Sequence, residues 1–268
     1  MIVNPVPPST LSTRIAEAFP RSRPETRTAL AVAAHLRAFA ARHMIGRQGD
    51  EEHVAMVLEG YVALRRTTTD GRQLIIRIVT HPSLTQVLPL AGRGAAGDAL
   101  ALTPSVAAIW QGSEVRALAD LDPGLAGDLL DHALVMFEET TARLDGLGYQ
   151  NAGRRVAAML QEHAELFFID QPVLQRSDLP GLVGTSREMT GRVLRVLEAR
   201  RVVERIGRDR LRLLDPAGLA TAAEIGLRGV ATPMELVPRQ QSSNDARVSR
   251  SLDRAGHGSP GDASGDAS

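Results

Sequence analysis

The side chains best suited to chemistry lie between residues 176 and 214, and the chemistry they suit is hydrogen bonding to DNA. Arg187, Glu188, Arg192 and Arg195 fall on the polar side of a predicted helix. A guanidinium group can donate two hydrogen bonds to guanine O6 and N7, and a carboxylate can accept from cytosine N4–H₂. The segment therefore predicts a helix-turn-helix followed by a two-stranded wing in a DNA-binding regulator.

The local sequence around this helix predicts the elements that position it. Ser177 can cap a short first helix over residues 178–183, and Gly184 allows the tight turn that follows. Thr185 and Glu188 have the spacing of a capping box, which would open the second helix. The apolar side of that helix is formed by Met189, Val193, Leu194 and Leu197.

A β-hairpin is predicted after the second helix, because Val202-Val203 and Leu211–Leu214 flank the turn sequence Gly207-Arg208-Asp209. Charge is concentrated in the same region. Residues 185–212 contain nine arginines and four acidic residues, whereas residues 101–150 contain two arginines and eight acidic residues. A basic patch confined to the helix and the wing is typical of a surface that binds a phosphate backbone, although the whole chain is neutral.

The segment SREMTGRVLRVLE at 186–198 closely resembles the recognition helix of the Crp/Fnr family of bacterial transcription regulators. The resemblance implies that Arg187, Glu188 and Arg192 contact bases, with a half-site similar to TGTGA. It assigns phosphate contacts to Arg176, Thr185, Ser186 and Arg195. Two simpler interpretations stay open: Glu188 only closes the capping box, and Arg192 lies on a solvated helix face.

Residues 23–121 are predicted to form a sensor domain of short antiparallel strands, the clearest at 54–58, 61–66 and 74–79. Asp70-Gly71 is a hairpin turn between the last two strands. The sequences at 48–50, 57–64 and 70–73 resemble the first half of the cyclic-nucleotide-binding jelly roll of the same family. The predicted fold class is therefore α+β: a jelly-roll sensor domain, a long dimerisation helix and a winged helix-turn-helix.

A long helix over residues 122–148 is predicted to connect the two domains, starting at Asp122-Pro123. Its apolar positions follow alternating spacings of four and three residues, with one polar member: Leu130, Leu134, Phe137, Thr141 and Leu144. The resemblance implies a homodimer seam. A helix packed against its own barrel would show the same short pattern.

The remaining segments complete the domain assignment. Residues 1–22 are rich in Pro, Ser and Thr and are predicted to be flexible, with a short helix over 11–19 as the alternative. A helix over 150–166 leads into the winged helix-turn-helix domain, residues 149–230. Residues 231–268 are predicted to be a disordered tail.

The effector is the least determined feature. Family members that bind cyclic AMP carry a Gly-Glu pair and a later Arg-Ser or Arg-Ala, but residues 80–110 contain no Gly-Glu and only Arg93. Cyclic AMP is therefore not the predicted effector. The chain has no cysteine, so a cysteine-ligated cluster is excluded. A haem sensor with His81 as an axial ligand and a vestigial pocket stay open, and no cofactor or metal is predicted.

The composition and the motifs of the sequence argue against other classes of protein. No apolar run approaches the roughly 18–20 residues of a membrane span, and no signal peptide is evident, so we expect a cytoplasmic protein without a membrane partner. No catalytic motif appears, which disfavours the alternative of a jelly-roll enzyme with an accessory helical domain. A scaffold whose winged helix binds protein is a further alternative. The expected partners are double-stranded DNA and a second copy, with RNA polymerase implied by the resemblance.

Overall fold

The computed structural model describes residues 8–227. The tail predicted for residues 231–268 and the first part of the segment predicted to be flexible, residues 1–7, lie outside the described residues. Among the helices of residues 8–227, none combines the length and the apolar character needed to cross a bilayer.

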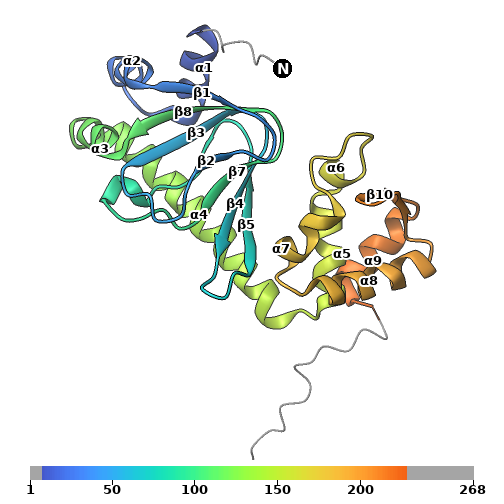
Figure 1. Cartoon of the computed structure of the whole chain (residues 1–268). Helices are drawn as coiled ribbons and strands as arrows, with labels where there is room; N and C mark the ends of the chain where they lie inside the picture. The colour runs from blue at the N-terminus through green and yellow to red at the C-terminus, as the bar shows by residue number, and fades with distance from the viewer. Residues whose placement is uncertain (1–7, 228–268) are drawn as a thin grey trace, which may run out of the picture. The chain divides into compact units, whose positions relative to one another are not determined.

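The sensor domain is built from two four-stranded antiparallel sheets, which confirms the predicted α+β class with an N-terminal jelly roll (Figure 1). One sheet has the order β1-β8-β3-β6 and the other the order β2-β7-β4-β5. The strands are β1 His35–Phe39, β2 Met44–Gly46, β3 His53–Glu59, β4 Val62–Thr67, β5 Gln73–Val79, β6 Ser83–Leu84, β7 Asp98–Ala101 and β8 Ser105–Gln111. Thus β3, β4 and β5 correspond to the three strands predicted at 54–58, 61–66 and 74–79.

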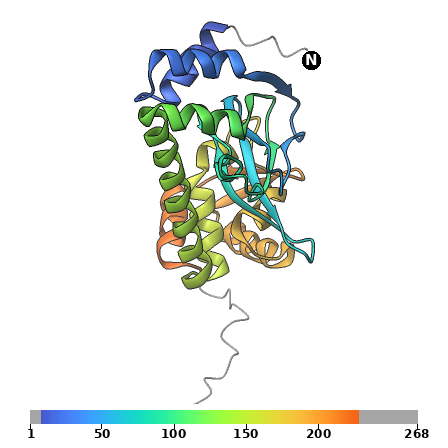
Figure 2. The same ribbon diagram turned by 90° about the vertical axis from the view of Figure 1, so that its left-hand side faces the viewer.

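Helices cover the outer face of the first sheet, and one of them corrects a prediction. Residues 8–18, expected to be flexible, form α1 (Pro8–Ala18), and Leu11, Ile15 and Phe19 are buried beside strand β3. The alternative of a short helix over 11–19 was the better one. Figure 2 shows α1 and α2 (Pro24–Ala33) together over one end of the barrel. The short helices α3 (Gly112–Leu121) and η1 (Leu88–Ala91) were not predicted.

The long helix α4 (Pro123–Tyr149) begins where Asp122-Pro123 predicted. The carboxylate of Asp122 accepts hydrogen bonds from the amides of Gly124 at 2.9 Å and Arg23 at 2.8 Å. One turn further on, buried Asp128 accepts from the amides of Arg21 and Ser22 and from the Arg21 guanidinium. The first turns of α4 are therefore fixed to the segment between α1 and α2.

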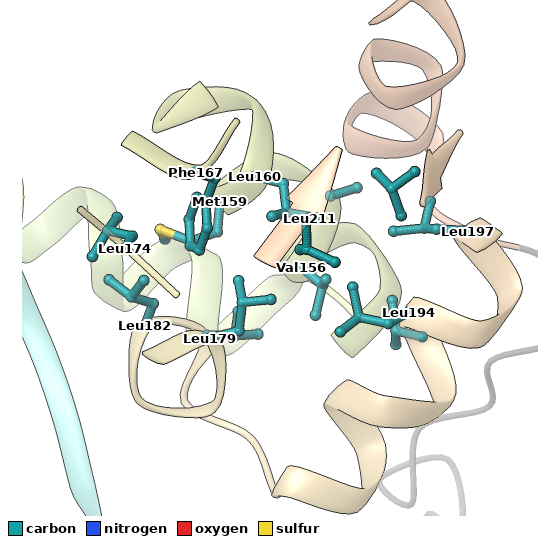
Figure 3. Close-up of a cluster of buried hydrophobic side chains, with 14 of the residues drawn as sticks. Val156, Met159, Leu160, Phe167, Leu174, Leu179, Leu182, Leu194, Leu197 and Leu211 are labelled. Carbon is teal, nitrogen blue, oxygen red and sulfur yellow. The ribbon is translucent and has the colours of Figure 1, made fainter. Parts of the chain in front are cut away.

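The winged helix-turn-helix follows α4, and its apolar core, drawn in Figure 3, is continuous with Ala63, Ile75 and Leu102 of the sensor domain. Its elements are α5 Ala152–Glu162, α6 Ala164–Phe167, η2 Arg176–Asp178, α7 Leu179–Val183, α8 Arg187–Ala199, β9 Val203–Ile206, β10 Arg210–Leu213 and α9 Pro216–Ile225. The single helix predicted over 150–166 is wrong: it is two helices, interrupted at His163, whose φ of −112° and ψ of 34° are not helical. Val156 and Leu160 of α5 and Leu197 of α8 are fully buried in this core.

Candidate nucleic-acid interface

Helix α8 presents a polar face to solvent because its opposite face is held in the core. Val193, Leu194 and Leu197 are buried, each at most 2 % exposed. The side chains of Arg187 and Glu188 at the start of the helix are exposed. The same is true of Arg192 and Arg195, which lie four and seven residues after Glu188. The structure therefore brings all four predicted contact residues of the helix onto one accessible face.

Glu188 and Arg192 form an ion pair across one turn of α8, with Nη2 3.0 Å from Oε1. Both side chains are largely exposed, and pairs of this kind contribute only about 0–1 kcal/mol. Releasing either group to a base edge therefore costs little. Because the N-cap of α8 is Ser186, Glu188 is not at the N3 position from which the carboxylate of a capping box reaches back.

The N-cap of α8 is one residue later than predicted. Ser186, not Thr185, is the cap: its Oγ accepts from the Met189 amide at 3.1 Å, and its backbone is extended, with φ −73° and ψ 155°. Thr185 lies in the turn after Gly184 and is half-buried. Because the first amides of a helix carry partial positive charge, the segment 185–187 is suited to a phosphate oxygen.

The first helix of the motif also begins differently from the prediction. Ser177 does not cap it; a 3₁₀ turn comes first, and Gln175 and Asp178 form the capping box. Asp178 is further held by a two-bond ion pair with Arg42 of the barrel, at 3.0 and 3.1 Å. The Arg176 amide donates to the Asp209 carbonyl at 2.8 Å, which connects this turn to the wing.

The wing is the predicted two-stranded hairpin, with Leu211 opposite Arg205 and Arg212 opposite Glu204. Leu211 is buried in the core, while Arg212 and Glu204 form an exposed pair at 3.1 Å. Gly207, with a φ of 63°, permits the tight turn between the strands. The turn places Arg208 at the exposed tip, on the domain that carries α8.

Two family models match the chain: a Crp-like helix-turn-helix domain over residues 154–222 and a cyclic nucleotide-binding domain over residues 36–122. The chain belongs to the Crp/Fnr family of transcription regulators. A Crp/Fnr-family regulator of Thermus thermophilus is 26 % identical, with a TM-score of 0.61 over 71 % of this chain and 98 % of that chain. No curated protein matches the sequence.

Other solved structures share the fold at lower identity. FixK2 of Bradyrhizobium japonicum is 20 % identical, with a TM-score of 0.59 over 70 % of this chain and 96 % of that one. The c-di-GMP-responsive regulator CLP of Xanthomonas campestris is 20 % identical, with a TM-score of 0.61 over 71 % of this chain and 99 % of that one. At this identity the likeness concerns the fold alone.

The sensor domain of this Crp/Fnr protein has a cavity of about 210 Å³ between its two sheets. Its ionisable lining residues are Arg37 of β1, Asp50 in the turn before β3 and His53 of β3. Residues 80–110, the segment that carries the cyclic-AMP cassette in the family, contribute no charged group to the lining, only Thr85, Gln86, Ala99 and Ile109. These residues do not fit a cyclic phosphate in the way that the family's Glu and Arg do.

Arg93 and His81, the other two sensor residues considered in the sequence, do not line this cavity. Arg93 is exposed after Gly92, whose φ of 62° marks a surface turn. His81 is also exposed and does not line the cavity between the sheets, so its placement does not favour a haem ligand. Within residues 8–227, no group of three or more His, Asp or Glu side chains is arranged to hold a metal ion.

The predicted seam residues of α4 all lie on one exposed face. The exposed fractions are 58 % for Leu130, 55 % for Leu134, 70 % for Phe137 and 62 % for Leu144. Thr141 is exposed between them and donates to the Phe137 carbonyl at 2.9 Å. These side chains are not packed against their own barrel, which was the alternative to a dimer seam. An apolar stripe of this kind on a soluble protein normally marks an interaction surface.

Proposed function

We propose that the protein is a homodimeric, sequence-specific DNA-binding regulator that reads a pseudo-palindromic site. Each α8 would lie in a major groove, with half-sites about one helical turn, ~34 Å, apart. Arg187, Glu188 and Arg192 would contact base edges in a TGTGA-like half-site. Arg176, Thr185, Ser186 and Arg195 would contact phosphates. RNA polymerase is the further partner that family membership suggests.

The observation that carries the proposal is the solvent-facing set Arg187, Glu188 and Arg192 on a helix anchored by its other face. Two arginines and a carboxylate on adjacent turns match the donor and acceptor pattern of a G·C-containing sequence. An effector other than cyclic AMP is proposed, because the cavity between the sheets lacks the family's charged cassette.

Selection from a randomised duplex library, with and without 3′,5′-cyclic AMP, tests the assignment. We expect the same two-fold symmetric motif in both conditions. Replacing Arg187 by Ala should cost about 1–3 kcal/mol of binding free energy and relax preference at one base pair per half-site. Arg116→Ala, an exposed arginine of α3, is the matched control. A uniform loss over all sequences would make Arg187 a phosphate contact instead.

The dimer is tested by sedimentation of a variant with charge in the seam. Phe137→Glu should convert the protein to a monomer, because the carboxylate would be buried against its symmetry mate. Val32→Glu is the matched control, since Val32 is an apolar side chain of α2 that is 82 % exposed. Equal dissociation constants for the two variants would exclude α4 as the interface.

A further inference from the structure

A second cavity, of about 370 Å³, lies where strand β5 meets helices α4, α5 and α7. We call it the junction cavity. Apolar side chains line part of it: Ile75, Ile78, Met159, Leu182 and Val183. Three arginines also line it, namely Arg77 of β5, Arg143 of α4 and Arg155 of α5, and the remaining polar lining residues are Glu139, Gln150, Glu162 and His163. No role has been assigned to these arginines in the DNA-binding surface or in the dimer seam.

Two of the arginines bury N–H groups that have no acceptor. Within the part of the chain that the structure describes, Nε and Nη1 of Arg77 and Nε and Nη2 of Arg143 are buried without a hydrogen-bond partner. Burial lowers the pKa of both guanidinium groups, yet arginine stays charged at neutral pH. Arg155 differs, since it donates to the carbonyls of Val183 and Gln150.

Unpaired buried donors are rare in native proteins, because each forfeits the hydrogen bonds it made to water. The nearby carboxylates do not remove this cost. Glu139 Oε2 lies 2.9 Å from Arg77 Nε but is out of line for a hydrogen bond, and its side chain is 45 % exposed. Glu162 is 66 % exposed. The acids therefore lie toward the solvent side, while the unpaired N–H groups lie inside.

We propose that the junction cavity binds a small phosphate monoester with an apolar or aromatic body. Planar guanidinium groups match the oxygens of a phosphate, and phosphate oxygens can accept from the unpaired N–H groups of both arginines. The aliphatic wall would hold the body of the ligand. The volume lies within the range of small-molecule sites, about 300–1,000 Å³.

The site is separate from the proposed dimer seam. Glu139, Arg143, Gly146 and Gln150 line the cavity at spacings of four, three and four residues, which defines one stripe of α4. The exposed apolar stripe from Leu130 to Leu144 lies on another side of the same helix. Occupation of the cavity would bridge α4 to α5, the first helix of the DNA-binding domain. That regulatory consequence rests on the proposed function, whereas ligand binding itself does not.

Titration of the full-length protein with phenyl phosphate, followed by two-dimensional amide NMR, tests the site. We expect saturable shifts for residues lining the junction cavity. Arg143→Gln and Arg77→Gln should each weaken binding at least ten-fold, and Arg116→Gln should leave it unchanged. Benzyl alcohol and benzoate should bind at least ten-fold more weakly than phenyl phosphate. No saturation by 10 mM, equal affinity in the arginine variants, or equal binding of either analogue would overturn the proposal.

A stability measurement separates a binding role from a structural one. If Arg143 is held for a ligand, Arg143→Met should keep or raise the midpoint of thermal unfolding of the ligand-free protein, because an unpaired buried charge is removed. A clear fall in the midpoint would show that Arg143 stabilises the fold and would overturn the assignment. These titrations use no DNA, so their outcome is independent of whether the protein binds an operator.

Discussion

The residue at the start of α8 sets where the recognition helix begins. Ser186 Oγ accepts from the Met189 amide, so Ser186→Ala should lower the free energy of unfolding by about 1 kcal/mol. Thr185→Ala, one residue earlier, should lower it much less, because Thr185 is not the cap. Urea unfolding at equilibrium measures both. A larger decrease in unfolding free energy for Thr185→Ala than for Ser186→Ala would show that Thr185 is the N-cap.

Gly184 illustrates a backbone requirement in the turn between α7 and α8. Its φ is +66°, and a Cβ would lie 2.6 Å from Leu147 Cδ2. Gly184→Ala should therefore lower the free energy of unfolding by at least about 1–2 kcal/mol, the cost of the left-handed conformation alone. Gly191→Ala is the matched control within α8, where a Cβ meets no atom within 4 Å. Gly191→Ala should raise the free energy of unfolding by about 0.5–1 kcal/mol. A decrease measured by equilibrium urea unfolding would contradict this prediction.

For individual residues, the sequence predicted which side chains of α8 face outward, because buried Val193, Leu194 and Leu197 and half-buried Met189 define the opposite face. It did not predict the caps. Thr185 and Ser186 are adjacent hydroxyl residues with similar capping ability, and only the backbone dihedral angles distinguish them. The unpaired N–H groups of Arg77 and Arg143 were also not predictable, since three other elements bury them.

Among the elements, α1 was the most difficult to predict, because its sequence is rich in Ser, Thr and Pro. A helix of 11 residues is marginal in isolation, so propensity alone gives little signal. Its stability in the protein comes from docking: Ile15 and Phe19 are 0 % and 1 % exposed. The broken helix at His163 was missed for a related reason, since the apolar pattern continues through the interruption.

Docking of α1 onto α4 should be sensitive to pH. Burial lowers the pKa of His132, whose neutral ring donates from Nε2 to the Ala18 carbonyl at 3.1 Å and packs edge-on against Phe19. A His with a lowered folded-state pKa contributes stability above its unfolded value of about 6.5, and this contribution is lost as the pH falls through the lower folded pKa. The wild-type protein should therefore lose stability between pH 7.5 and pH 5.

Comparison of variants isolates that contribution. His132→Gln should show a smaller loss of unfolding free energy between the two pH values than the wild-type protein. His81→Gln, at an exposed position, should behave as the wild-type protein does. Identical pH profiles for the three proteins would mean that His132 does not titrate differently in the folded and unfolded states.

For the whole molecule, DNA binding should depend on where the charged residues lie and not on the net charge, which is zero. The chain carries 31 basic and 31 acidic residues, so long-range attraction to DNA has to come from the local arginines of the winged helix-turn-helix. Arg195→Ala should weaken binding to all duplexes alike. It should also reduce the slope of log affinity against log salt by about 1.8 per dimer, at about 0.9 per phosphate contact.

Arg116→Ala is the control for the salt titration. Arg116 lies on α3, so its replacement should not change the slope. An altered base preference in Arg195→Ala, with an unchanged slope, would reassign Arg195 from phosphate to base contact. Measurement over about 50–200 mM salt resolves a difference of this size.

The fixed start of α4 has a mechanical consequence. With 27 residues, the helix is about 40 Å long at about 1.5 Å per residue. Asp122 and Asp128 fix its first turns, and Glu139 pairs with Arg77 of β5 further along. A tilt of about 5° about the first turns would move the far end by about 3.5 Å, close to the roughly 3.4 Å between successive base pairs. An angular change that scarcely disturbs packing in the barrel would thus be enough to move a recognition helix by one step along the DNA.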